Sequence, residues 1–309
     1  MQTPDRQLAQ EWMNTLFGTE IQLVPQLTCQ LAHELQMEGG VLSQWRIHAV
    51  QPIELTWTLH VFMPARITDA PRILLSPDGC WPQCVNPSAM QACAAQGVSL
   101  AWFDRLEFAH DPPTGLRQGP FYDQLPDIDT GCLSVWAWSI SLNAQALHSL
   151  TPTTKIGVIG HSRGGKAALL CAARDSRIDA VISNNSGTGG AASLAVVGEG
   201  AESLHDLVKV YPHWLSKAAS DPVMQLRLRD IDCMAAWANI APRPVLILQA
   251  REDAWAHPAG TKFAHEALKV YWPNASSFRL VERESAHAMQ VADWQQASQF
   301  MRMPHPGWN

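Results

Sequence analysis

The sequence contains no long hydrophobic run and no cluster of basic residues. None of its 309 residues lies in an apolar stretch approaching the roughly twenty positions that a transmembrane helix needs. The 28 acidic residues outnumber the 22 Lys and Arg residues, and the net charge is -6. Binding of nucleic acid depends on clustered basic side chains that neutralise phosphates. We therefore expect neither a membrane nor a nucleic acid as a partner, and small or neutral ligands fit better.

Signals of export and of disulfide bonding are also missing. The first twenty-five residues carry several charged side chains and include no apolar segment of the kind that a secretory signal contains. The cysteines number seven, an odd count, and Cys93 and Cys171 lie in alanine-rich helical sequence, where a free thiol acts as a small hydrophobic side chain. Cys80 and Cys84 form the only close pair, and no second Cys/His pair at ligand spacing accompanies them. We predict unpaired thiols, no metal site and a cytoplasmic location, with secretion open if a signal precedes Met1.

Short apolar runs alternate with helical segments along most of the chain. No repeat, low-complexity tract or linker divides it, so we expect one domain over residues 1–309. Strand–helix alternation is typical of a mostly parallel, doubly wound α/β sheet. The predicted strands are 54–63, 72–76, 98–103, 155–160, 180–184 and 245–250, and the predicted helices are 87–96, 133–150, 165–174 and 261–270.

Two parts of the chain fall outside this alternation. Residues 1–50 are predicted to form an amino-terminal helical extension, opened by Thr3 as N-cap and Pro4 in the first turn. Residues 186–232 carry no strand signal and are predicted to form a helical cap or insertion. Such a cap would lie over the carboxyl ends of the strands, where open α/β sheets bind their ligands.

The segment from Gly160 to Gly164 reads Gly-His-Ser-Arg-Gly and lies between an apolar run and an Ala/Leu-rich helix. A serine between such glycines is typical of the sharp strand-to-helix turn that exposes a nucleophile, although glycine-rich turns also arise without catalysis. We predict Ser162 as the nucleophile and the backbone N–H of Arg163 as a donor to the developing oxyanion, with its guanidinium as a further donor. Lys166 lies one helical turn beyond the serine, where it either binds a substrate hydroxyl or carboxylate or is a solvated side chain.

Several segments together resemble bacterial members of the glucuronoyl esterases, carbohydrate esterase family 15. They are GHSRGGKAALLCAARDSRIDAVISNNSGTGGAA, YPHWL, IAPRPVLILQAREDAWAHP and AWFDRLEFAHD, and the resemblance covers roughly residues 98–300. It implies an α/β-hydrolase fold. It also implies hydrolysis of esters at the carboxyl group of 4-O-methyl-glucuronic acid, the linkage between glucuronoxylan and lignin alcohols. The serine mechanism predicted from the sequence needs no cofactor.

The resemblance also implies roles for individual residues. By it, Ser162 is the nucleophile, Arg163 helps to stabilise the oxyanion and Lys166 binds the uronate ring. Glu202 matches a family glutamate that contacts sugar hydroxyls, and Trp255 matches a tryptophan that lines the same pocket.

The acid of the triad departs from the pattern of many family members, which carry a glutamate where this chain has Asn185. An amide cannot neutralise an imidazolium, so Asn185 is a poor replacement. Other bacterial members use an aspartate after the next strand, where Asp253 lies. The strand order independently places Asp253 at the active-site edge, with Glu252 as second candidate and an exposed turn acid as the alternative. His287 in the last loop completes the order Ser, Asp, His.

These features predict a serine esterase that uses Ser162, His287 and Asp253, with a second oxyanion donor near Asp78-Gly79-Cys80. The preferred substrates are esters of glucuronic acid or 4-O-methyl-glucuronic acid, and without an export signal small esters taken up by the cell are expected rather than polymeric ones. The alternative is a general carboxylesterase, acetyl esterase or dienelactone-hydrolase relative acting on small esters, and a third hypothesis is a non-catalytic binding module on the same fold. The oligomeric state stays open.

Overall fold

The computed structural model describes residues 3–66, 71–152, 154–306 and 308. Within them, nine strands form one sheet in the order β1-β2-β3-β5-β4-β6-β7-β8-β9. From β5 to β9 all neighbours are parallel, whereas β1, β2 and β3 are antiparallel to their neighbours. The strands are β1 (Gln26–Met37), β2 (Gly40–Val50), β3 (Leu55–Pro64), β4 (Arg72–Ser76), β5 (Ser99–Phe103), β6 (Lys155–His161), β7 (Ala180–Asn184), β8 (Val245–Ala250) and β9 (Phe278–Arg283).

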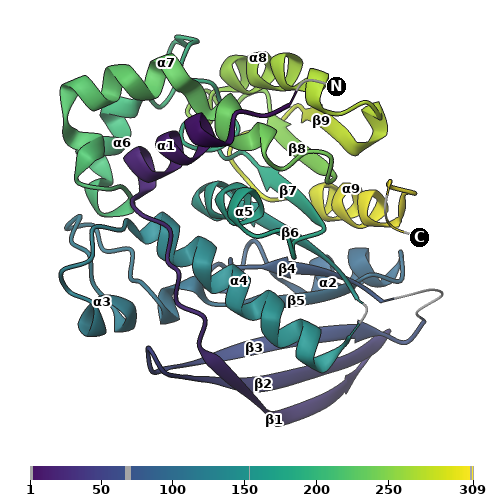
Figure 1. The fold of residues 1–309 in the computed structure, drawn as a ribbon. Coiled ribbons are helices and arrows are strands. Elements are labelled where there is room, and N and C mark those ends of the chain that lie inside the picture. Colours follow the sequence, from purple (N-terminus) through teal and green to yellow (C-terminus); the bar gives the residue numbers. More distant parts are fainter. Residues whose placement is uncertain (1–2, 67–70, 153, 307, 309) are drawn as a thin grey trace.

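Helices cover both faces of the parallel part of the sheet, as Figure 1 shows. Successive residues of a strand point to opposite faces, so Val181 belongs to the core cluster that contains residues of α4, α5 and α7, while Ile182 belongs to the cluster that contains residues of α2 and α9. The predicted mostly parallel, doubly wound α/β sheet is confirmed. The helices are α1 (Arg6–Phe17), α2 (Pro87–Ala94), α3 (Pro120–Gln124), α4 (Cys132–Leu150), α5 (Arg163–Arg174), α6 (Leu204–Val210), α7 (Pro222–Ala238), α8 (Pro258–Leu268) and α9 (Val291–Arg302).

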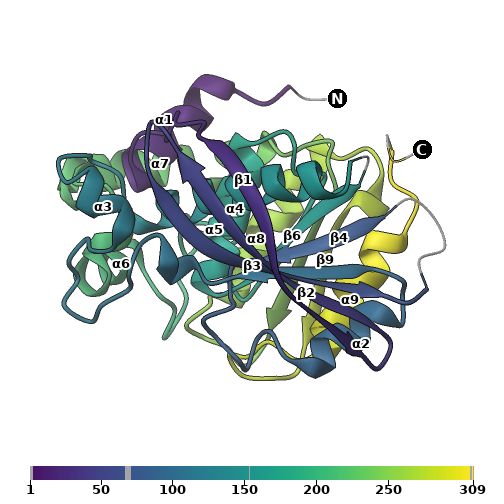
Figure 2. The same cartoon turned by 90° about the horizontal axis from the view of Figure 1, so that it is seen from below.

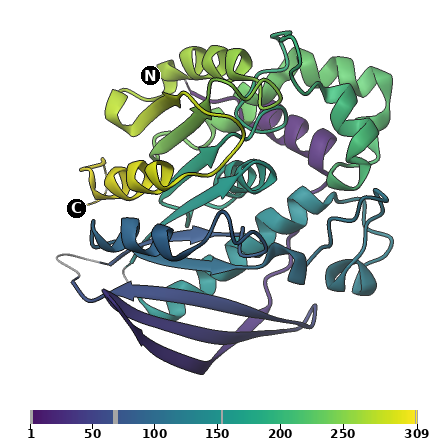
Figure 3. The same cartoon turned by 180° about the vertical axis from the view of Figure 1, so that it is seen from behind.

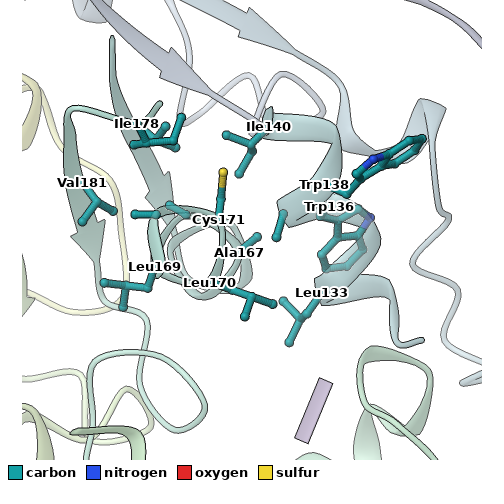
Figure 4. Packing of buried hydrophobic residues seen from close by; sticks show 14 of the residues in the cluster. Leu133, Trp136, Trp138, Ile140, Ala167, Leu169, Leu170, Cys171, Ile178 and Val181 are labelled. Atoms are coloured by element: carbon teal, nitrogen blue, oxygen red, sulfur yellow. The ribbon is translucent and has the colours of Figure 1, made fainter. Parts of the chain in front are cut away.

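The helix that follows the Gly-His-Ser-Arg-Gly segment is held in the centre of the larger core. Figure 4 shows the apolar side chains of α4 and α5 packed against one another, with Ile178 and Val181 beside them. Leu170 and Ala167 of α5 and Ile140 of α4 are fully buried. Burying a side chain of leucine or isoleucine size contributes about 1.5–3 kcal/mol. This packing holds the start of α5, and therefore the residue before it, in a rigid position.

The prediction of a helical extension over residues 1–50 is wrong for most of that range. Among residues 3–50, which the structure describes, only α1 is helical, and it begins at Arg6 with Asp5 as its N-cap, not at Thr3. β1 and β2 instead extend the sheet as a curved antiparallel ribbon beside β3 (Figure 2). The ribbon forms because β2 alternates between buried residues such as Ile47 and exposed ones such as Arg46, so one face packs on the core.

Residues 186–232 contain no strand among those that the structure describes, as predicted. They hold α6, two short 3₁₀ turns and the first part of α7, which is kinked at Asp232. Figures 1 and 3 show α7 beside α1, and Trp12 Nε1 donates to the carbonyl of Leu228 at 3.1 Å. In the described part of the chain, no helix has the length and apolar character that crossing a membrane requires.

Candidate active site

Ser162 occupies the turn between β6 and α5. Its backbone has a positive φ of 54° with ψ of -120°, a conformation that is strained for a residue with a side chain. The glycines on either side are needed for close packing, because a Cβ at Gly160 would collide with the backbone of Gly164 and one at Gly164 would collide with the carboxylate of Asp78. The turn therefore has the geometry of a nucleophile elbow.

An acid and an imidazole lie beyond the ends of β8 and β9. His287 Nδ1 is 2.5 Å from Asp253 Oδ2, and Asp253 is only 5% exposed. The other carboxylate oxygen, Asp253 Oδ1, accepts from the backbone N–H of Ala256 at 3.1 Å. A proton on Nδ1 leaves Nε2 of His287 as the basic nitrogen. His287 and Ser162 line the same cavity of about 210 Å³.

Asn185 follows β7 and connects the two loops that carry this pair. Its Oδ1 accepts from the N–H of Ala250 at 2.7 Å, and its Nδ2 donates to the carbonyl of Ala288 at 3.1 Å. Ala250 ends β8, and Ala288 directly follows His287. The buried amide thus makes two backbone hydrogen bonds and none to the imidazole, which agrees with the interpretation that it is not the acid.

Arg163 begins α5, and its guanidinium lies on another wall of the cavity. It forms an ion pair with Asp111 and lies over the rings of Trp214, Trp81 and Tyr211, at 4.6, 5.2 and 5.6 Å from their centroids. Such cation–π contacts stabilise a partly desolvated cation. Its Nε is buried and has no hydrogen-bond partner among the described residues.

Lys166 and Glu202 form a buried ion pair that borders the same cavity. Lys166 Nζ is 2.8 Å from Glu202 Oε2, both side chains are 4% exposed, and Nζ also donates to the carbonyl of Thr188. Burial lowers the pKa of Lys166, and the Glu202 carboxylate opposes this shift. Lys166 is therefore not a solvated surface side chain. Trp255 is 44% exposed at the rim, and its carbonyl accepts from the N–H of Glu202 at 3.0 Å.

The loop after β4 was expected to supply a second oxyanion donor. At two of its three positions the backbone N–H already donates to another group of the protein. The N–H of Gly79 donates to the carbonyl of Phe103 at 3.0 Å, and that of Asp78 to Ser76 Oγ at 3.3 Å. An N–H bound to another acceptor is not free to bind an oxyanion, so Cys80 is the candidate donor that this loop retains.

All seven cysteines are free in the described structure, as predicted for Cys80 and Cys84. Burial raises the pKa of the Cys80 thiol to about 12, so this thiol is neutral at physiological pH. No cluster of three or more metal-binding side chains occurs among the residues that the structure describes.

Several residues beside the cavity were not singled out from the sequence. Asp111, Trp81 and Tyr211 received no role, although Asp111 and Tyr211 lie in segments that carry the family resemblance. Another is His213, whose Nε2 lies 2.8 Å from Asp111 Oδ1. The ring of His161, the residue before the nucleophile, lies 4.6 Å from that of His287. Burial lowers its pKa to about 4, with a further contribution from His287.

A nucleophile elbow after a central parallel strand, followed by an Asp–His pair after two later strands, defines the fold and site of an α/β-hydrolase. A family model described as glucuronyl esterase of fungi matches residues 59–274. The chain belongs to this glucuronyl esterase family.

Individual relatives agree with this membership. A 4-O-methyl-glucuronoyl methylesterase of Hypocrea jecorina is 31% identical over 192 residues, covering 58% of this chain and 41% of the relative. A carbohydrate esterase, MZ0003, from an unknown prokaryotic organism is 37% identical over 145 residues, covering 46% of this chain and 33% of the relative. The chain thus spans less than half the length of both curated relatives.

Solved structures show the same fold over nearly the whole chain. A glucuronoyl esterase from Solibacter usitatus superposes with a TM-score of 0.80 at 22% identity, covering 96% of this chain and 91% of the other. The catalytic domain of the glucuronoyl esterase from Hypocrea jecorina gives a TM-score of 0.75 at 22% identity, covering 96% and 80%.

Proposed function

We propose that the protein is a serine esterase that hydrolyses esters of glucuronic acid or 4-O-methyl-glucuronic acid. The observation that carries this proposal is a single cavity of about 210 Å³. Ser162 and His287 border it beside the buried Lys166–Glu202 ion pair. A nucleophile and base next to a paired cation and anion suit a substrate that is both an ester and a polyhydroxylated ring. Family membership supports the same substrate class.

The reaction proceeds through an acyl-enzyme. Nε2 of His287 removes the proton of Ser162 as Oγ attacks the ester carbonyl, and Asp253 stabilises the imidazolium that forms. The backbone N–H and the guanidinium of Arg163 stabilise the oxyanion. The bond to the alcohol then breaks, and His287 passes its proton to the leaving oxygen. In the second half, His287 takes a proton from water, the resulting hydroxide attacks the acyl group, and Ser162 regains its proton as the uronate leaves.

The sugar ring lies on the side of the cavity that Lys166 and Glu202 border. Lys166 Nζ donates to ring hydroxyls, and Glu202 accepts from them, since each retains hydrogen-bonding capacity beyond its partner. Trp255 at the rim offers an aromatic face to the ring or to the alcohol. A hydroxyl that pairs with buried charged groups can contribute about 1.5–3 kcal/mol, so these contacts discriminate a uronate from an acetyl ester.

The decisive assay compares acid release from benzyl glucuronate with acetate release from an acetylated sugar, using wild type and Ser162→Ala. We expect a clear preference for the glucuronate ester. Loss of the nucleophile should lower turnover by at least about a thousandfold without changing the melting temperature. Faster hydrolysis of the acetylated sugar would favour a general acetyl esterase. Retained turnover in the alanine variant would exclude Ser162 as the nucleophile.

A further inference from the structure

Asp111 has no role in the steps above, yet it lies directly behind the cavity wall with three side-chain donors on its carboxylate. Arg163 pairs with its Oδ2. His213 Nε2 and Trp214 Nε1 each lie 2.8 Å from its Oδ1. The Asp111 side chain is 11% exposed and that of His213 is 2% exposed. A carboxylate in this position would be costly to bury without such partners.

The two oxygens of this carboxylate serve different parts of the molecule. Oδ2 holds the first residue of α5, next to the nucleophile, whereas Oδ1 holds the 3₁₀ turn Pro212–Trp214 in the segment between β7 and β8. Burial raises the pKa of Asp111, but the His213 hydrogen bond, the Arg163 charge and the Trp214 hydrogen bond outweigh it and hold the pKa below its usual range. The carboxylate is therefore ionised throughout the neutral range.

The contacts of Arg163 restrict the orientation of its side chain. An arginine side chain carries about 2 kcal/mol of rotamer entropy when it is free. Here one nitrogen of the guanidinium pairs with Asp111, and the guanidinium carbon lies 4.6 Å from the centre of the Trp214 ring. The Arg163 side chain is still 24% exposed and lines the cavity, so in this orientation it can reach a bound ester.

We propose that Asp111 is a positioning residue for the ester hydrolysis: it holds the Arg163 guanidinium toward the reacting ester and fixes the turn that carries Trp214 relative to Ser162. This inference rests on the proposed function. It predicts that the contribution of Asp111 to turnover passes through Arg163.

The first test is Asp111→Asn. An asparagine can keep Oδ1 on His213 and Trp214, while its NH₂ group replaces the oxygen that accepts from Arg163. We expect kcat to fall about tenfold to 100-fold, within the range for impaired oxyanion stabilisation, with KM changed less than about twofold. A matched control is Asp129→Asn, which breaks the partly exposed ion pair with Arg117 at 3.1 Å. This control should retain wild-type kcat and KM.

A double-mutant cycle separates positioning from a purely structural role. If Asp111 acts through Arg163, then Asp111→Asn should change kcat by less than about twofold in an Arg163→Ala background. Equal losses in both backgrounds would overturn the proposal, as would wild-type kcat in the single Asp111→Asn variant. Melting temperatures of all four proteins check that each variant is folded.

The cycle is measured with benzyl glucuronate and with an aryl acetate. If the wild-type protein hydrolyses neither ester, both the proposed function and the role of Asp111 are overturned. If it hydrolyses at least one ester, but Asp111→Asn lowers kcat by the same factor with and without Arg163→Ala, only the role of Asp111 is overturned.

Discussion

The cavity has two walls that are built in different ways. The strand-end wall consists of Ser162 and His287, with Asp253 behind the histidine, and these residues follow β6, β9 and β8 within a few positions. The segment wall consists of Glu202, Tyr211 and Trp214 from the helical segment between β7 and β8. A parallel sheet gathers its carboxyl ends at one edge, so the first wall follows directly from the topology.

The segment wall depends instead on contacts between parts far apart in the chain. Asp111 holds the turn that ends at Trp214. Ser216 Oγ, two residues later, donates to the carbonyl of Thr15 in α1. Under the proposed function, the strand-end wall performs the chemistry and the segment wall selects the substrate.

The largest effect that this comparison predicts is on the strand-end wall. Asp253→Asn keeps the shape of the side chain but no longer favours the tautomer of His287 that leaves Nε2 basic, so we expect kcat to fall about 10⁴-fold. The measurement is kcat at pH 7 for any ester that the wild type hydrolyses. Glu252 is exposed, and Glu252→Gln should stay within about twofold of wild type. If the two variants lost equal activity, Asp253 would not be the acid.

At the buried Lys166–Glu202 ion pair, Lys166→Met should separate the contribution to stability from the proposed contribution to substrate binding. It leaves Glu202 buried without its partner, which typically costs about 3–5 kcal/mol of unfolding free energy. The hydrolysis of benzyl glucuronate should fall about 10- to 100-fold in kcat/KM. In Lys166→Met/Glu202→Leu, urea unfolding should show recovered stability because no buried charge remains, while kcat/KM stays low. If the double variant recovered both its stability and its kcat/KM, Lys166 and Glu202 would not bind the substrate.

A smaller effect is expected where the strand-end wall is held in place. In Asn185→Asp, one oxygen can still accept from Ala250, but the other would face the carbonyl oxygen of Ala288 and repel it. We expect the His287 loop to shift and kcat to fall about tenfold, since small displacements of a catalytic group are costly. Asn274→Asp makes the same chemical change at an exposed cap of a 3₁₀ turn and should leave kcat unchanged. An unaltered kcat in Asn185→Asp would show that the bridge is dispensable.

The smallest predicted effect concerns a group on neither wall. Burial raises the pKa of Glu107 from 4.5 to about 7, although the N–H of Thr58 donates to its carboxylate. The folded state therefore holds this proton more tightly than the unfolded state does. The resulting stabilisation is complete below pH 4.5 and is lost as the pH rises to about 7. Chemical unfolding between these pH values should show a flatter profile for Glu107→Gln, with unchanged turnover; an identical slope would contradict the raised pKa.

Sequence reasoning succeeded where the structure obeys local rules. The predicted runs 72–76, 180–184 and 245–250 coincide with β4, β7 and β8, because a buried parallel strand is a short continuous apolar run with turn signals behind it. The elbow at Ser162 was predicted from its glycines. The structure also brings Asp253 and His287 into hydrogen-bonding contact, as the strand order had indicated.

Prediction from the sequence failed where the sequence pattern is weak or where the contacts join distant parts of the chain. β1 is exposed along most of its length and lacks a clear apolar alternation, so it was not recognised as a strand. Asp111 gave no local signal, because its partners Arg163 and Trp214 are 52 and 103 residues away. Tertiary packing decides which residues of two loops meet, and no local pattern in the sequence indicates the outcome.

The pairing of α1 with α7 has a consequence for the order in which the protein matures on the ribosome. Trp12 donates to a carbonyl 216 residues later in the chain. At a synthesis rate of about 5–20 residues per second, the first helix therefore waits roughly ten seconds or more for its partner. The antiparallel ribbon β1–β3 joins consecutive strands and can assemble early. The apolar face of the first helix therefore lacks its cover from α7 until Leu228 has been synthesised.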